Sequence, residues 1–233
     1  MTDLRSHRAI LALADGRVFE GWSFGAVGET TGEVVFNTAM TGYQEVLTDP
    51  SYKGQIVCMT YPEIGNVGVN EEDVESGRVY VEGFIVKEYW PRPSNWRSSM
   101  SLGEYLRQAN VVGIEGIDTR ALVRHIRTHG AQEAVISSVD LDPENLVRKA
   151  KASPGLVGRD LVREVTCKEP YDWELAEWQL GSGYDKPSVQ QLRDAPLVVA
   201  VDYGIKHNIL RRLVASGFRV KVVPAHATSE QIL

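Results

Sequence analysis

Two cysteines and five histidines are the side chains of this sequence best suited to nucleophilic or metal chemistry. Cys58 lies within the strand-like run Ile56–Met59. The sequence around it offers no base and no helix N-terminus that would lower the pKa of its thiol, as a nucleophile requires. Cys167 lies beside Lys168 in a more polar context, again without a catalytic partner. We therefore interpret Cys58 as a buried structural cysteine and assign no catalytic role to Cys167.

His125 and His129 are four residues apart on a predicted helix, Thr119–His129. This spacing places both rings on one face, where they could ligate a metal ion. No third ligand is in view, and the sequence contains neither C-x-x-C nor H-E-x-x-H. We favour a solvated or half-buried histidine pair and predict no metal site.

Two turn-like tripeptides could contact a ligand. Asp202-Tyr203-Gly204 ends a predicted strand of parallel type, where α/β proteins form ligand sites. A tight strand-to-helix turn explains the same residues equally well. Asp49-Pro50-Ser51 can leave a hydroxyl and backbone amides pointing outward, yet on physical grounds alone a simple turn is favoured there.

Asp49-Pro50-Ser51 belongs to an unusually long polar segment. Two apolar, β-branched runs, Glu33–Asn37 and Gln55–Tyr61, predict strands within the stretch Gly32–Asn70. The segment between them is longer than an ordinary connection and is rich in Thr, Gly, Tyr, Asp, Pro and Ser. We interpret it as a loop that forms a contact surface.

Local signals predict a mixed α/β fold for the region around this loop. Asp15-Gly16 favours a hairpin turn between Ala9–Leu13 and Val18–Trp22. N-cap residues open three helices, at Ser101, at Asp118 and at Asp142, which is followed by Pro143. Further predicted elements are strands at Val79–Tyr89, Val111–Ile117 and Glu133–Ser137 and helices at Thr119–His129 and Asp142–Lys151.

The pattern changes near the C-terminus. Leu197–Asp202, Lys206–Ser216 and Phe218–Val223 predict strand, helix and strand, the unit of a parallel sheet covered by helices. Ser229 resembles the cap of another helix. We predict a first domain at 1–180, a linker at 181–195, whose small polar residues are typical of linkers, and the incomplete opening of an α/β domain at 196–233.

Composition limits the function classes. The 233 residues carry a net charge of −6 and are 43% hydrophobic, typical of a soluble globular protein of one large or two ordinary domains. The acidic balance disfavours a nucleic-acid partner, and no apolar run could span a bilayer. No signal peptide is evident, and the few cysteines suit a reducing compartment. We expect a cytoplasmic protein, without a nucleic-acid or membrane partner.

Distinctive motifs recur in a fixed order along essentially the whole chain. They are GEVVFNT at 32–38, MTGYQE at 40–45, LTDPSY at 47–52, QIV at 55–57, TYP at 60–62, GNVG at 65–68, IDTRAL at 117–122, RTHGAQ at 127–132, PGLVG at 154–158 and DYGIKHNIL at 202–210. Together they closely resemble one family, the small, glutamine-hydrolysing chain of carbamoyl-phosphate synthase.

This resemblance implies an N-terminal domain special to these synthases, followed by a class I glutamine amidotransferase domain. In the family, a Cys–His–Glu triad hydrolyses glutamine, and the ammonia passes through a tunnel to the large subunit. The large subunit uses bicarbonate and ATP to make carbamoyl phosphate for arginine and pyrimidine synthesis. The resemblance thus implies the large subunit and glutamine as partners, no cofactor in this chain, and ATP with Mg²⁺ on the large subunit.

The sequence departs from the family pattern in one respect. It contains neither the G-x-C-x-G turn of the nucleophile nor the H-P-E motif, so Cys58 and Cys167 receive no catalytic role and we expect the chain alone to be inactive. Ser51 does match a family residue that contacts glutamine, which reverses the preference for a simple turn. A catalytically inert docking module for the large subunit is the alternative. A nucleotide-binding protein is disfavoured, because no G-x-G-x-x-G or P-loop motif is present.

Overall fold

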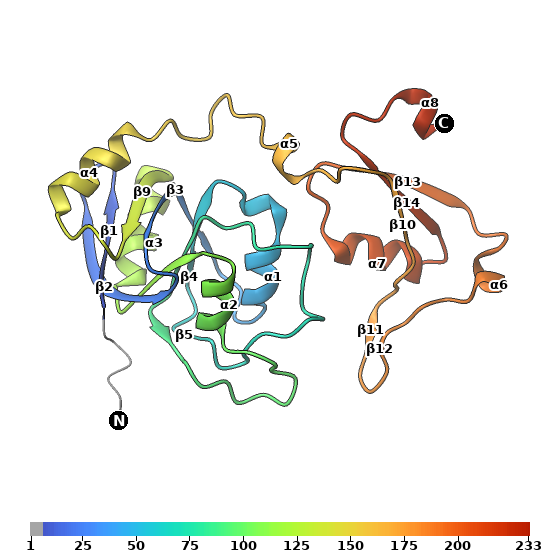
Figure 1. The fold of residues 1–233 in the computed structure, drawn as a ribbon, viewed down its shortest axis with the longest axis horizontal. Coiled ribbons are helices and arrows are strands. Elements are labelled where there is room, and N and C mark those ends of the chain that lie inside the picture. The colour runs from blue at the N-terminus through green and yellow to red at the C-terminus, as the bar shows by residue number, and fades with distance from the viewer. Residues whose placement is uncertain (1–6) are drawn as a thin grey trace. The chain divides into compact units, whose positions relative to one another are not determined.

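Seven strands in the N-terminal part of the chain close into a barrel, drawn in blue to yellow-green in Figure 1. The computed structural model describes residues 7–233, which form two compact units. The barrel belongs to the first unit, which extends to Thr48 and also contains Tyr52–Asp73 and Arg78–Arg159. The second unit contains Asp49–Ser51, Val74–Gly77 and Asp160–Leu233. The domain limits 1–180, 181–195 and 196–233 stay a prediction.

The barrel strands follow the order β1-β2-β8-β6-β4-β3-β9. The pairs β3–β4, β4–β6 and β6–β8 are parallel, and the other four pairs are antiparallel. The broad prediction of a mixed α/β protein is confirmed, whereas the closed barrel was not foreseen. In sequence order the strands are β1 (Arg8–Leu13), β2 (Val18–Gly25), β3 (Glu29–Asn37), β4 (Gln55–Met59), β6 (Gly83–Ile85), β8 (Val112–Glu115) and β9 (Gln132–Ser137).

Alternate residues of strands β1, β4 and β9 face two different cores, as the two-residue period of a strand requires. Ile56 and Cys58 of β4 join the cluster inside the barrel, whereas Val57 and Met59 join a second cluster outside it. On β1 and β9, the outward-facing residues pack against helix α4. Both faces of these strands are therefore buried, and the barrel is a filled core.

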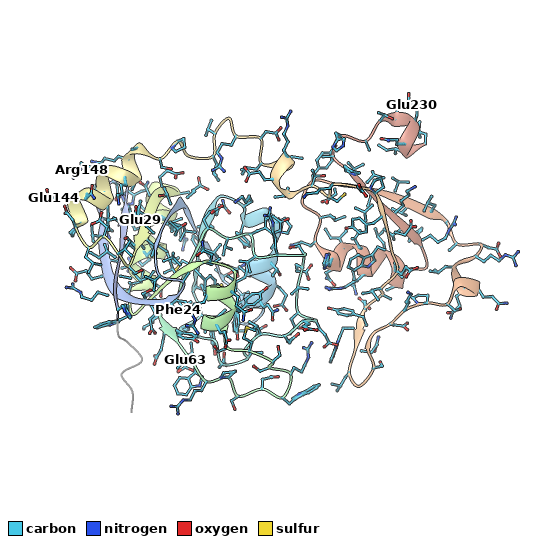
Figure 2. All side chains as sticks on the ribbon, viewed as in Figure 1. Phe24, Glu29, Glu63, Glu144, Arg148 and Glu230 are labelled. Atoms are coloured by element: carbon cyan, nitrogen blue, oxygen red, sulfur yellow. The ribbon has the colours of Figure 1, made fainter. Side chains whose placement is uncertain are left out.

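Helices with the predicted caps surround the barrel. The side chains of Ser101, Asp118 and Asp142 accept hydrogen bonds from the backbone N–H groups of Glu104, Ala121 and Glu144. The outer face of α4 carries exposed charges, among them Glu144 and Arg148 (Figure 2). The helices of this unit are α1 (Tyr43–Thr48), α2 (Leu102–Gln108), α3 (Thr119–His129) and α4 (Pro143–Ala152).

Two predictions for this unit were wrong. The segment after β3 is not an open loop, because it folds into α1, which buries Tyr43, Val46 and Leu47, and a 3-10 helix, η1 (Pro50–Tyr52). The predicted strand Val79–Tyr89 is two short strands with different partners. Its first part, β6, joins the barrel, and its second, β7 (Glu88–Tyr89), pairs in parallel with β5 (Glu63–Ile64).

The second unit contains a three-stranded sheet in the order β10-β14-β13. The predicted strand–helix–strand is confirmed: β13 (Leu197–Asp202) and β14 (Arg219–Pro224) are parallel and are joined by α7 (His207–Ala215). β10 (Tyr171–Trp173) pairs antiparallel with β14. The core includes Leu210 and Val214 of α7 and Val220 and Val222 of β14.

Short elements complete this unit. β11 (Trp178–Gln179) and β12 (Gly183–Tyr184) form a hairpin, so structure extends into the predicted linker. Thr228, not Ser229, is the N-cap of the last helix, with Gln231 completing its capping box. The other helices are α5 (Val162–Val165), α6 (Val189–Leu192) and α8 (Ser229–Ile232). Across residues 7–233, no helix has both the length and the apolar character needed to cross a membrane.

Candidate functional site

Neither cysteine has the surroundings of a nucleophile. Cys58 lies inside the barrel with no exposed surface, and burial raises the pKa of its thiol to about 12. Cys167 is half-buried in the second unit, where burial and the nearby carboxylate of Asp202 raise the pKa of its thiol. A raised pKa disfavours the thiolate that attacks a substrate. The burial of Cys58 confirms its interpretation as a buried cysteine, and the assignment of no catalytic role to either cysteine stays a prediction.

Asp202 organises the turn between β13 and α7. Its buried carboxylate accepts hydrogen bonds from the backbone N–H groups of Gly204 at 2.9 Å and Ile205 at 2.8 Å, and from that of Cys167 at 2.7 Å. Gly204 has a φ of +95°, a conformation that favours glycine. The side chain of Tyr203 between them is exposed. Asp202-Tyr203-Gly204 is therefore a tight turn with one outward side chain.

The predicted ligand turn around Ser51 lies against this βα turn. The Ser51 backbone N–H donates to Asp49 Oδ1 at 2.9 Å, and Lys206 Nζ lies 3.2 Å from Asp49 Oδ2. A Cβ built on Gly204 would lie 3.2 Å from Pro50 Cβ, so the two turns approach closely. Ser51 itself is exposed. The structure thus brings together two tripeptides that the sequence singled out separately.

A third segment, Val74–Gly77, completes this region and was missed from the sequence. The backbone carbonyl of Glu75 accepts the N–H of His207 at 2.8 Å, and Glu75 Oε2 accepts the N–H of Asn208 at 2.9 Å. Glu75 therefore caps α7, whose own N-cap residue, Lys206, provides no side-chain cap. The lack of Ser, Thr, Asp or Asn at position 206 was the one available signal that another segment supplies the cap.

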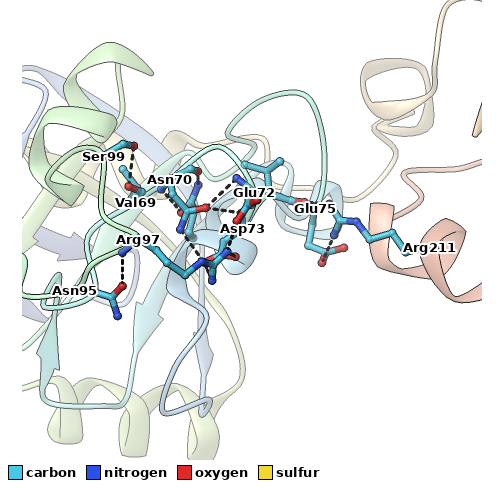
Figure 3. A network of polar contacts seen from close by, with 11 residues as sticks. Val69, Asn70, Glu72, Asp73, Glu75, Asn95, Arg97, Ser99 and Arg211 are labelled. Atoms are coloured by element: carbon cyan, nitrogen blue, oxygen red, sulfur yellow. Dashed lines mark hydrogen bonds and ion pairs between the residues drawn. The ribbon is translucent and has the colours of Figure 1, made fainter. Parts of the chain in front are cut away.

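Arg211 ties the same segment to the body of α7 (Figure 3). Its Nη1 lies 3.6 Å from Glu75 Oε1, and its Nη2 donates to the carbonyl oxygen of Val74 at 3.0 Å. The guanidinium also lies over the Tyr184 ring, 4.2 Å from its centroid. Burial, together with the positive charge of Arg211, lowers the pKa of His207 to about 4. His207 is therefore neutral at physiological pH.

A cavity of about 640 Å³ opens beside the carboxyl ends of β13 and β14 in the same unit. This edge of a parallel sheet is where α/β proteins bind ligands. Basic side chains on its wall could attract an anionic group. The half-buried Cys167 on the same wall is a poor nucleophile, because the pKa of its thiol is raised. The lining residues are Asp160, Val162, Arg163, Thr166, Cys167, Lys168, Tyr203, Ala225 and His226.

The predicted histidine pair has a structural partner. His125 is buried, and its Nε2 lies 2.5 Å from Asp15 Oδ2 in the β1–β2 turn. His129 Nδ1 lies 3.0 Å from the carbonyl oxygen of His125, and the two ring centroids are 4.5 Å apart. Among the residues that the structure describes, no group of three or more His, Cys, Asp or Glu side chains could hold a metal ion.

Comparison with known proteins relates this architecture to one family. The family model described as "Carbamoyl-phosphate synthase small chain, CPSase domain" matches residues 11–136, which include the barrel apart from residues 8–10 at the start of β1 and Ser137 at the end of β9. The carbamoyl phosphate synthase small chain of Syntrophotalea carbinolica is 64% identical over 228 residues, covering 97% of this chain and 59% of the relative. The small chain of Aquifex aeolicus is 55% identical, covering 96% and 59%.

The small chain of a Synechococcus species is 54% identical over 225 residues, covering 97% of this chain and 56% of the relative. The chain thus spans less than two thirds of the length of the curated relatives that it matches. These matches cover 96–97% of the chain and so extend over both compact units. On the family match and these identities, the chain belongs to the carbamoyl-phosphate synthase small-chain family.

Proposed function

We propose that this chain functions in the glutamine-hydrolysing small subunit of carbamoyl-phosphate synthase. In that role the subunit converts glutamine to glutamate and ammonia. The ammonia then passes to a large subunit, which makes carbamoyl phosphate from bicarbonate and ATP. Family membership supports this proposal, and so does the location of the Ser51 turn.

One observation carries the proposal. Asp49–Ser51 lies between the barrel strands β3 and β4 in the sequence, yet it belongs to the second unit. There it contacts the turn that follows β13. Ser51 is exposed, and its hydroxyl can donate one hydrogen bond to a ligand and accept others. It would contact a ligand held at the carboxyl edge of the β13–β14 sheet. We propose that this ligand is glutamine and that Ser51 binds it without taking part in bond cleavage.

The chemistry of hydrolysis needs groups that this chain does not contain. The sequence has no G-x-C-x-G and no H-P-E motif, and both thiols have raised pKa values. We therefore predict that the purified 233-residue chain does not hydrolyse glutamine. An assay coupled to glutamate should detect no product. Hydrolysis that survives replacement of both Cys58 and Cys167 by alanine would contradict this prediction.

The remaining parts of the proposal concern the assembly. We propose a cytoplasmic heterodimer with the large subunit, on which ATP and Mg²⁺ bind, and a product that feeds arginine and pyrimidine synthesis. No cofactor is assigned to this chain. The acidic net charge of −6 supports the absence of a nucleic-acid partner.

The test is Ser51→Ala in the assembled synthase that contains this sequence. Loss of one ligand hydrogen bond costs about 0.5–1.5 kcal/mol, so the apparent KM for glutamine should rise roughly two- to twelvefold. Synthesis from added ammonia should be unchanged, because ammonia bypasses the glutamine site. Ser94→Ala, at an exposed serine of the barrel unit, is the matched control. An unchanged apparent KM for glutamine would show that Ser51 is an ordinary turn residue.

The absence of the two catalytic motifs favours one alternative, a docking module that holds the large subunit and does no chemistry. The two proposals differ in the complex of this chain with the large subunit. Synthesis from ammonia but not from glutamine, with no effect of Ser51→Ala on glutamine binding, would favour the docking module.

A further inference from the structure

Helix α7 begins with a cap supplied by a segment 133 residues earlier in the sequence. The first N–H groups of a helix have no partner within the helix and need an acceptor. In α7 these acceptors are the backbone carbonyl and the carboxylate of Glu75, which take the N–H groups of His207 and Asn208. The negative carboxylate also lies at the positive end of the helix dipole.

Arg211 fixes the capping segment from the next turn of the helix. It contacts the Glu75 carboxylate and the Val74 carbonyl, while Tyr184 covers one face of its guanidinium. Glu75 is 9% exposed and Arg211 is 6% exposed. Water therefore cannot easily replace either partner, and loss of one would leave the other charge buried and poorly compensated.

These contacts act directly on the turn beside Ser51. His207, whose N–H bonds to Glu75, follows Lys206, whose ammonium contacts Asp49. The backbone of Gly204, two residues earlier, approaches Pro50. The end of the βα turn is thus held by Glu75, and its middle lies against the serine turn.

We propose that Glu75 and Arg211 are positioning residues for the glutamine site. They touch no substrate and instead hold the β13–α7 turn in the arrangement that faces Ser51. This inference rests on the proposed function, since it names residues that support the same site. Without the clamp, the turn would populate displaced states, and the apparent affinity for glutamine would fall in proportion to the competent fraction.

Steady-state kinetics of the assembled synthase give the first test. Glu75→Ala should raise the KM for glutamine about tenfold, with kcat and ammonia-dependent synthesis unchanged. Glu75→Gln should recover most of the affinity, because its amide oxygen can still accept from Asn208. Glu71→Ala, at an exposed glutamate of the same loop, is the control and should have no effect.

Variants at Arg211 test the clamp from the other side. Arg211→Lys keeps the charge but loses the planar group over Tyr184, and it should raise the glutamine KM by a smaller factor than Arg211→Ala. Arg212→Ala, which removes the exposed ion pair with Glu177, is the matched control. If either alanine variant fails to fold, Arg211→Lys carries the test, and an unaltered glutamine KM in Arg211→Lys would overturn the proposal.

Amide hydrogen exchange of this chain provides a readout that does not depend on activity. Glu75→Ala should leave the barrel strands protected and accelerate exchange at Asn208, whose N–H loses its carboxylate acceptor. Unchanged protection there would refute the positioning role, whatever the kinetics show. An unchanged KM for glutamine in Glu75→Ala, combined with a raised KM in Ser51→Ala, would refute the clamp and leave the proposed function standing. Faster exchange with no effect of Ser51→Ala would count against the glutamine site itself.

Discussion

Replacing Asp202 by asparagine should both destabilise the second unit and make Cys167 more reactive. The carboxylate is 5% exposed and accepts three backbone hydrogen bonds, from Cys167, Gly204 and Ile205. Asparagine keeps the oxygen that serves Gly204 and Ile205. Its NH₂ group, however, would face the N–H of Cys167, so that hydrogen bond is lost.

The size of the stability effect follows from these contacts. A hydrogen bond to a charged group contributes about 1.5–3 kcal/mol, and the two remaining bonds lose their charge assistance. We expect Asp202→Asn to lower the free energy of unfolding by about 2–4 kcal/mol, measured by urea denaturation and followed by tryptophan fluorescence. Asp172→Asn, at an exposed aspartate of β10, should change it by less than about 0.5 kcal/mol.

The effect on Cys167 tests the electrostatic argument separately. Burial raises the pKa of its thiol, and the negative charge of Asp202 raises it further. Removing that charge favours the thiolate, so the pH midpoint of iodoacetamide alkylation at Cys167 should move down. Cys58 stays unreactive in the folded protein, because it is fully buried with a pKa of about 12. An alkylation midpoint that does not move would refute the assigned influence of Asp202.

Two further predictions concern the barrel and the βα turn. The pKa of Asp15 is lowered because hydrogen bonds from the Arg17 backbone and His125 outweigh the effect of burial, so its stabilising contribution is present above pH about 4 and is lost as the pH falls further. Asp15→Asn should therefore reduce the pH dependence of barrel unfolding below pH 4; an identical acid profile would contradict this. Gly204→Ala should destabilise the second unit by about 1–3 kcal/mol, because φ is +95° and the new Cβ would lie 3.1 Å from a methyl of Val165. Gly77→Ala is the control, because nothing lies within 4 Å of its new Cβ. Equal urea denaturation midpoints for the two variants would refute the predicted strain at Gly204.

The helix starts were predictable because capping is local chemistry. Ser101, Asp118 and Asp142 each accept from a backbone N–H two or three residues onward, so the signal and its effect lie within one turn. The β1–β2 hairpin and the parallel β13–β14 pair were found for the same reason, since a turn signal or a short helical pattern links each pair of strands.

The barrel could not be predicted in this way. Its parallel pairs join strands far apart in sequence, such as β6 and β8, and nothing within either strand specifies the partner. β1 and β4 are also buried on both faces, because one face lines the barrel and the other packs against neighbouring clusters. Hydrophobic alternation, which would have marked a sheet with one wet face, is therefore absent from them.

The candidate site was partly predictable. Asp49-Pro50-Ser51 and Asp202-Tyr203-Gly204 each carried a local signal, but only the fold reveals that Lys206 contacts Asp49. Glu75 carried no signal of its own, because an acidic residue in a polar loop is ordinarily solvated. Its role became visible only through the uncapped start of α7.

The most direct test of the central claim is a structure of the assembled synthase with glutamine bound. We predict the Ser51 hydroxyl oxygen within about 3.2 Å of a polar atom of glutamine, at the carboxyl edge of the β13–β14 sheet, with Lys206 still paired to Asp49. Glutamine bound with the Ser51 hydroxyl out of hydrogen-bond reach, in a complex that hydrolyses glutamine normally, would contradict the account.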